Sequence, residues 1–82
     1  MMKAMILNGP NLDRLGTREP DVYGATTLAD IEAQCRQLAD SLGWTIDFRQ
    51  TNDEAVLVGW LHEAADEACP VIINPAAFTH YS

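Results

Sequence analysis

The sequence predicts an α/β protein with a parallel sheet and helices on both faces of that sheet. Three short segments, residues 4–7, 44–49 and 71–73, have the apolar composition of strands. Two longer segments, residues 27–42 and 52–68, lie between these strands and carry apolar side chains at helical spacing. Strands that alternate with helices form parallel sheets through right-handed crossovers. We therefore expect a strand–helix–strand–helix–strand order within one sheet.

The first strand is followed by a long irregular segment. Residues 4–7 are apolar at every position, which is typical of a strand buried on both faces. Residues 8–25 show no hydrophobic periodicity and contain three glycines and two prolines, so we expect a loop there. Loops of this length in compact domains are commonly lids or binding loops, or else disordered.

The first helix has recognisable signals at both of its ends. Thr27 and Asp30 have the spacing of a capping box, and Gly43 suits a left-handed cap at the other end. The apolar positions between them are expected to face the sheet. They are Leu28, Ile31, Cys35, Leu38, Ala39 and Leu42.

The remaining elements follow from alternation and from a second capping signal. Apolar and polar residues alternate over 44–49, which predicts a strand with one less buried face. Asn52 or Asp53 caps the second helix, which is expected to run to about Ala68. Its inward positions are Val56, Leu57, Trp60, Leu61 and Ala64. Pro70 then precedes a third strand, over residues 71–73, that we expect to be buried.

Length, charge and cysteine content exclude several classes of protein. The 82 residues allow one small domain, and a formal net charge of −7 argues against nucleic-acid or anionic membrane partners. No apolar run approaches the roughly 20 residues that a membrane span needs. Cys35 and Cys69 are too few for a disulfide scaffold and lack metal-ligand spacing. We therefore expect a cytoplasmic protein with a single domain over residues 1–82. That domain is expected to be incomplete, since doubly wound sheets usually have more than three strands.

The predicted site lies where two loops leave the carboxyl ends of the strands, because parallel sheets bind ligands at that edge. In the first loop, Arg18 and Tyr23 lie five residues apart. A tyrosine with an ordinary pKa near 10 serves as a general base only if a nearby cation favours its phenolate. Arg18 can supply that charge. The alternative is a solvent-facing arginine and a tyrosine packed on the sheet edge.

Asparagine and histidine side chains complete the candidate set. Asn8 and Asn11 flank a Gly-Pro pair, which favours a turn first and an oxygen-binding pair second. Asn74 can bind a hydroxyl or carboxylate, or can simply form a turn before proline. His80 can donate hydrogen bonds, bind a ligand or transfer protons, or can be merely solvated. The sequence contains no glycine-rich phosphate loop and no metal-ligand cluster.

Several motifs keep a common order and spacing over essentially the whole chain. They are Asn8-Gly9-Pro10-Asn11-Leu12, Leu15-Gly16-Thr17-Arg18-Glu19-Pro20 with Val22-Tyr23-Gly24, Gln50-Thr51-Asn52, Leu61-His62-Glu63-Ala64, and Ile73-Asn74-Pro75 with Thr79-His80. In combination they resemble type II 3-dehydroquinate dehydratase, the small dehydroquinase of the shikimate and quinate pathways. The resemblance covers about the first half of such an enzyme and stops before the histidine that the family uses as general acid.

The resemblance implies a flavodoxin-like domain that dehydrates 3-dehydroquinate to 3-dehydroshikimate without metal or organic cofactor. Tyr23 matches the residue that removes a proton next to the ketone, and Arg18 matches the arginine that favours its phenolate. Asn11 matches the asparagine that helps to hold a water against the developing enolate oxygen. Asn74 and His80 match residues that bind substrate hydroxyls and carboxylate.

The resemblance also implies self-association into a homododecamer. The competing interpretation is a flavodoxin-like module that binds a nucleotide or phosphate without catalysis. The fold and the long first loop permit such a module. The loop is net acidic, however, and has no glycine-rich phosphate cradle, so the sequence favours the enzyme.

Overall fold

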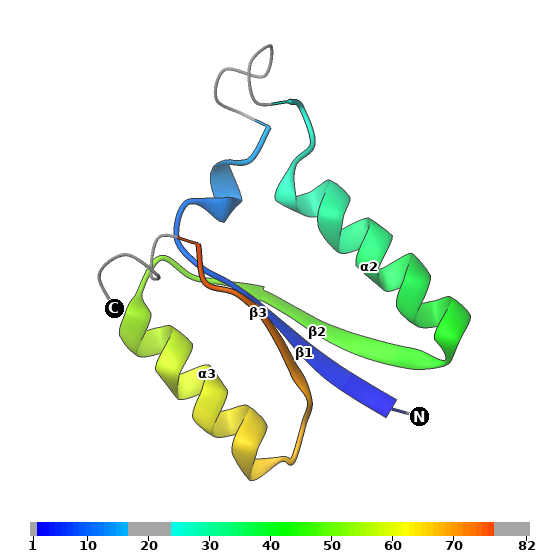
Figure 1. Ribbon diagram of the computed structural model, residues 1–82, viewed down its shortest axis with the longest axis vertical. Helices are drawn as coiled ribbons and strands as arrows, with labels where there is room; N and C mark the ends of the chain where they lie inside the picture. The colour runs from blue at the N-terminus through cyan, green and yellow to red at the C-terminus, as the bar shows by residue number, and fades with distance from the viewer. Residues whose placement is uncertain (1, 17–23, 77–82) are drawn as a thin grey trace.

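The described part of the chain folds as a three-stranded parallel sheet with two α-helices (Figure 1). In the computed structural model, residues 2–16 and 24–76 are described. The elements in chain order are β1 (Met2–Asn8), a short 3-10 helix η1 (Leu12–Arg14), α2 (Leu28–Leu42), β2 (Trp44–Gln50), α3 (Glu54–Asp66) and β3 (Val71–Asn74). The sheet order is β2-β1-β3, and β1 pairs in parallel with both neighbours. The predicted parallel α/β architecture is confirmed.

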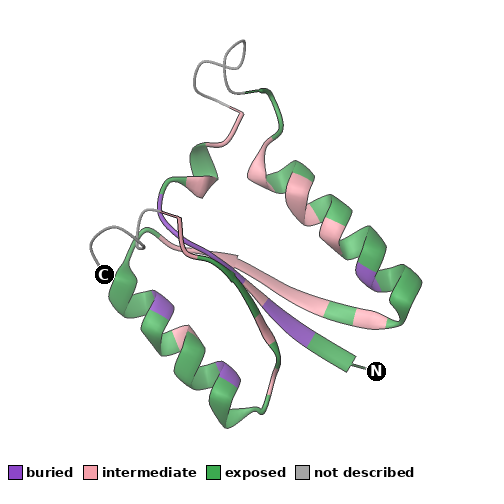
Figure 2. Ribbon diagram, viewed as in Figure 1, coloured by how far each residue is buried: buried purple, intermediate pink, exposed green. Residues whose placement is uncertain are grey.

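The two helices lie on opposite sides of the sheet, as Figure 1 shows. Met5 and Leu7 of β1 are fully buried against Leu57 and Ala64 of α3. Neighbouring residues of a strand point to opposite faces, so Ala4 and Ile6 lie on the α2 side. Burial is concentrated in β1 (Figure 2), as its continuous apolar run predicted.

Local signals set the helix ends as expected. Thr27 Oγ1 accepts a hydrogen bond of 3.1 Å from the Asp30 N–H, and Asp30 Oδ2 accepts one of 2.9 Å from the Thr27 N–H. This completes the capping box of α2. Gly43 caps the other end with φ 76°. Of the two candidate caps of α3, the structure uses Asp53, whose Oδ1 accepts from the Ala55 N–H at 2.8 Å.

Several predicted boundaries differ from the structure. The expected loop over residues 8–25 begins one residue later, because Asn8 still belongs to β1, and it contains η1. Asn11 adopts a left-handed conformation (φ 67°) and η1 follows directly. α3 ends at Asp66 rather than near Ala68, since Ala68 has φ 52° and cannot continue a right-handed helix.

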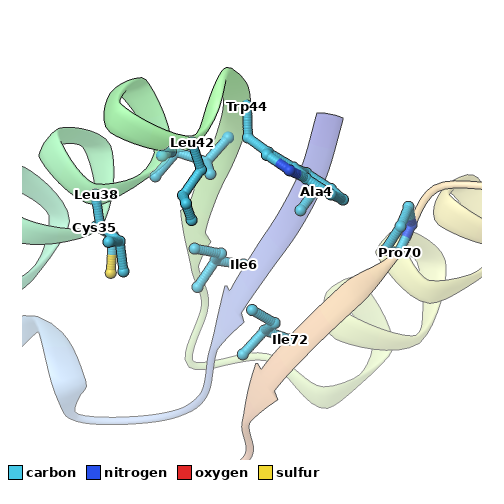
Figure 3. Close-up of a pocket in the computed structure, with 10 residues that line it drawn as sticks. Ala4, Ile6, Cys35, Leu38, Leu42, Trp44, Pro70 and Ile72 are labelled. Carbon is cyan, nitrogen blue, oxygen red and sulfur yellow. The ribbon is translucent and has the colours of Figure 1, made fainter. Parts of the chain in front are cut away.

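The prediction that the third strand is buried is wrong for the described chain. Ile73, which lies on the α3 side, is 42% exposed. Ile72 is 63% exposed, because β3 is an edge strand and α2 does not cover its other face. An open apolar groove lies on this face (Figure 3), lined among others by Ala4, Ile6, Leu38, Leu42, Trp44 and Ile72. The two leucines face the groove yet stay mostly exposed because it is open.

The inward face predicted for α3 was too broad. Leu57 and Ala64 are buried, and Trp60 packs against the core. Val56 and Leu61 are exposed instead, because they flank this narrower stripe. Within the described residues, no helix is long and apolar enough to cross a membrane.

Candidate active site

A row of amide side chains marks the carboxyl edge of the sheet. The backbone register pairs Asn8, the last residue of β1, with Gln50 of β2 on one side. It pairs the same Asn8 with Asn74 of β3 on the other side. All three strands therefore end at the same level, each with an amide-bearing residue. This is the edge where parallel sheets bind ligands, so it is where the sequence placed the site.

Asn8 holds the strand ends together. It is 5% exposed, and its Nδ2 donates a hydrogen bond of 2.9 Å to the Arg49 carbonyl. Its own carbonyl accepts from the Thr51 N–H at 3.0 Å. The sequence left a turn and an oxygen-binding pair open for Asn8 and Asn11. Asn8 instead belongs to β1, and its side-chain Nδ2 is bonded to the backbone of β2.

Gly9 brings the two predicted site loops into contact. Its N–H donates to the Asn74 carbonyl at 2.8 Å. A Cβ at this position would lie 2.8 Å from the Pro75 carbonyl carbon and nearer still to its oxygen. Only glycine allows the start of the first loop to lie this close to the start of the second.

Asn11, one of the predicted site residues, has an unusual backbone conformation. Its left-handed φ of 67° turns the chain into η1, and its side chain is exposed and does not cap that helix. The Asn11 N–H donates to Asn52 Oδ1 at 2.9 Å. Asn74 ends β3, next to the Gly9 backbone. The structure therefore brings the segments that carry Asn11 and Asn74 to one edge of the sheet.

Arg18, Tyr23 and His80 lie outside the described residues, so their proposed roles rest on the sequence. The described residues on either side of the segment that contains Arg18 and Tyr23 lie close together. Gly16 has φ 76°, and a Cβ there would lie 2.9 Å from the Ala25 carbonyl carbon. Gly16 and Ala25 thus lie close together.

No metal cluster competes with this edge in the described part of the chain. Residues 2–16 and 24–76 contain no group of three or more potential metal-binding side chains. The apolar groove of Figure 3 lies on the α2 face, and neither Asn11 nor Asn74 lines it. Its lining offers almost no groups that could move protons, so we assign no chemistry to it.

Sequence reasoning missed a charged cluster near the carboxyl edge of the sheet, formed by Asp47, Arg49 and Glu63. Arg49 of β2 donates two hydrogen bonds to Asp47, at 2.7 and 3.0 Å, and also pairs with Glu63 of α3. Its guanidinium lies 5.4 Å from the centre of the Trp60 ring. Asp47 and Arg49 occupy alternate positions of a strand and so share a face, which is the one signal that the sequence offered. The cluster fixes α3 against β2, next to Gln50.

The stability of this cluster is expected to depend on acid pH. The hydrogen bonds from Arg49 hold the pKa of the Asp47 carboxyl below its ordinary value, and the positive charge of Arg49 acts in the same direction. A lowered pKa stabilises the fold above the unfolded value, which is near 3.9, and this stabilisation is lost as pH falls through the folded value. We expect Asp47→Asn to lower the free energy of unfolding at pH 7 by about 1 kcal/mol.

Urea unfolding of both proteins at pH 7 and near pH 3 tests this expectation. The difference between them should shrink at the lower pH. Asp40→Asn makes the same charge change at an exposed position of α2 and is the matched control. A difference that stays constant from pH 7 to 3 would contradict the role of the Asp47 carboxylate.

Comparison with known proteins places this chain in a family. The family model described as "Dehydroquinase class II" matches residues 2–82. The chain belongs to the class II dehydroquinases. The resemblance inferred from the loop motifs is thereby confirmed. A curated relative from Kineococcus radiotolerans, named 3-dehydroquinate dehydratase, is 56% identical over 81 residues, which are 99% of this chain and 56% of the relative. One of the same name from Maricaulis maris is 60% identical over 77 residues, covering 94% and 53% of the two chains.

Solved structures of class II dehydroquinases have the same fold. The type II dehydroquinase from Propionibacterium acnes superposes with a TM-score of 0.90 at 48% identity, covering 99% of this chain and 56% of that one. The type II dehydroquinase from Butyrivibrio crossotus superposes with a TM-score of 0.90 at 33% identity, covering 99% and 57%. These neighbours agree with the expected flavodoxin-like α/β fold. The chain spans about half the length of the curated relatives it matches, and it corresponds to their N-terminal part.

Proposed function

We propose that this protein dehydrates 3-dehydroquinate to 3-dehydroshikimate. The observation that carries the proposal is an identity of 56–60% to curated relatives named 3-dehydroquinate dehydratase, over 94–99% of this chain. The geometry supports it, because Asn11 and Asn74 lie on segments that meet at the carboxyl edge of the sheet. Residues 1–82 then belong to one catalytic domain, and the substrate is a small polyhydroxy carboxylate.

The reaction needs a base, a stabilised enolate and a departing hydroxyl. In the proposed mechanism, the Tyr23 phenolate removes the proton from the carbon next to the ketone, and the Arg18 guanidinium favours that phenolate. Asn11 helps to hold a water against the enolate oxygen as negative charge develops there. Asn74 and His80 bind the substrate hydroxyls and carboxylate.

The elimination is completed when the C–O bond of the leaving hydroxyl breaks. The enolate reforms the ketone, a conjugated double bond appears, and the hydroxyl takes a proton and departs as water. In the family that proton comes from a histidine on a later strand, and His80 matches a different position. Every proton is accounted for by side chains and substrate, so no metal or organic cofactor enters the mechanism.

We further propose a homododecamer and a cytoplasmic location for the functional protein. The resemblance to the family is what supports the dodecamer. Two free cysteines within the described chain, with no disulfide between them, fit a reducing compartment. Sedimentation of the purified full gene product tests the assembly, and a mass other than that of twelve subunits would overturn it.

An absorbance assay tests the proposed activity. The purified full gene product, treated with a chelator and given 3-dehydroquinate, is expected to form a product with the ultraviolet absorbance of a conjugated enone. A nucleotide- or phosphate-binding module would instead form no product and would bind a nucleotide in titration calorimetry. The second outcome would overturn the proposed function.

Arg18 is expected to tune the base rather than merely carry charge. Without its positive charge the phenolate is less favoured, so the limb of the pH–rate profile that reports Tyr23 should move to higher pH in Arg18→Ala. Arg18→Lys keeps the charge but loses the planar group with several donors, so the same shift should be smaller, and kcat should fall in both variants.

Profiles of kcat against pH for both variants provide the measurement. Arg36→Ala is the control, because it also removes one positive charge, from a residue of α2 that pairs with Glu32. If the profiles of the Arg18 variants coincide with that of the unsubstituted protein, Arg18 does not tune Tyr23.

A further inference from the structure

Asn52 lies at the centre of a hydrogen-bond network that reaches the Asn11 turn. Its side-chain oxygen accepts two hydrogen bonds, one from the Asn11 N–H at 2.9 Å and one from Gln50 Nε2 at 3.0 Å. Gln50 Nε2 also donates to the Gly9 carbonyl at 3.1 Å. Gln50, the last residue of β2, and Asn52, two positions later, are thus each tied to a residue 41 positions earlier, in the loop that leaves β1.

We propose that Asn52 is a positioning residue of the dehydratase site, acting through Asn11. This rests on the proposed function, in which the Asn11 side chain acts on the developing enolate oxygen. Asn11 has φ 67°, a conformation that L-residues rarely adopt, and its N–H points at the Asn52 oxygen in that conformation. The backbone conformation of a residue sets the direction in which its side chain leaves the chain. By holding the Asn11 backbone N–H, Asn52 therefore orients the side-chain amide of Asn11.

The helix that follows does not need the Asn52 side chain. Asp53 caps α3, with its Oδ1 accepting from the Ala55 and Val56 N–H groups. Asn52 is also exposed, so its removal sacrifices little apolar packing. A substitution at Asn52 should therefore disturb the Asn11 turn while leaving the fold and the start of α3 intact.

Among the described residues, the side chain of Asn52 acts in this network as an acceptor, so two substitutions have different expected effects. Asn52→Ala removes the oxygen, so it releases the Asn11 N–H and one donor of Gln50. Asn52→Asp keeps an oxygen in the same place and can accept both hydrogen bonds. Hydrogen exchange of the Asn11 amide, followed by NMR, should be faster in Asn52→Ala and should stay slow in Asn52→Asp.

Kinetics of the full gene product provide the functional test. We expect Asn52→Ala to lower kcat by about tenfold or more with little change in KM, because misplacing Asn11 weakens stabilisation of the transition state. In an Asn11→Ala background, the same Asn52 substitution should lower kcat no further, since residues that act as a unit are not additive. Gln37→Ala, which removes an amide from the exposed face of α2, is the matched control.

The possible outcomes separate this inference from the function on which it rests. An unchanged kcat in Asn52→Ala, or losses that multiply in the double variant, would overturn the positioning role. A lower urea midpoint together with proportional loss of active protein would assign Asn52 to stability instead. If the unsubstituted protein forms no enone product, the proposed function fails, and the exchange of the Asn11 amide still decides whether Asn52 holds the turn.

Discussion

Tyr23→Phe is expected to abolish nearly all turnover of 3-dehydroquinate while leaving the fold intact. The substitution removes only the phenol oxygen, which is the atom proposed to take the proton from carbon. Loss of a general base typically lowers the rate by about 10²–10⁴-fold. The measurement is kcat for the full gene product from the enone absorbance, with circular dichroism to verify the fold.

The other tyrosine of the sequence provides the control. Tyr81→Phe removes the same hydroxyl from a residue with no proposed role, so its kcat should stay close to that of the unsubstituted protein. A Tyr23→Phe protein with near-normal kcat would refute the assignment of the base. Equal losses in both variants would show that the effect is not specific to proton abstraction.

Helix ends were predictable because their signals are local. The side chains of Thr27 and Asp30 and the left-handed Gly43 interact with backbone within a few residues, so sequence alone places them. Which of Asn52 and Asp53 caps α3 could not be predicted, because it depends on residues that are distant in the sequence. The Asn52 oxygen bonds to Asn11 and Gln50 instead, and the sequence contains no sign of that distant partner.

Burial of the third strand depended on contacts that the sequence does not state. An apolar run such as residues 71–73 indicates a strand but not what covers each face. In the described chain α3 covers one face near Val71, whereas Ile72 faces the open groove beside α2. The prediction of a strand was right and the prediction of its burial was wrong for that reason.

The meeting of the two candidate site segments at one edge of the sheet was more predictable than the contacts between them. The rule that parallel sheets bind ligands at their carboxyl edge predicts from the sequence that Asn11 and Asn74 lie near one another. The register that aligns Asn8 with both Gln50 and Asn74 could not be predicted, because it depends on how the strands pair. The role of Gly9 was equally hidden, since close approach of two backbones leaves no trace in sequence spacing.

Gly9→Ala is expected to damage both stability and activity, because Gly9 is where the two site loops touch. An alanine Cβ would lie 2.8 Å from the Pro75 carbonyl carbon, and the neighbour is backbone that cannot rotate away as a side chain does. Overpacking of this kind typically costs about 1–3 kcal/mol of the free energy of unfolding. To relieve it, the segment that starts at Asn74 must move away from the loop that carries Asn11, so kcat should fall as well.

Gly59 offers a matched comparison for the same substitution. It lies within α3, and nothing lies within 4 Å of a Cβ built there. Gly59→Ala should therefore raise the free energy of unfolding by about 0.5–1 kcal/mol, as alanine favours helix over glycine. Combining the two substitutions restores part of the stability without relieving the contact at Pro75. In that double variant, measured by urea unfolding and by the enone assay, stability should recover in part while kcat stays low. Recovery of kcat together with stability would show that Gly9 supports the fold alone and does not set the distance between the two site loops.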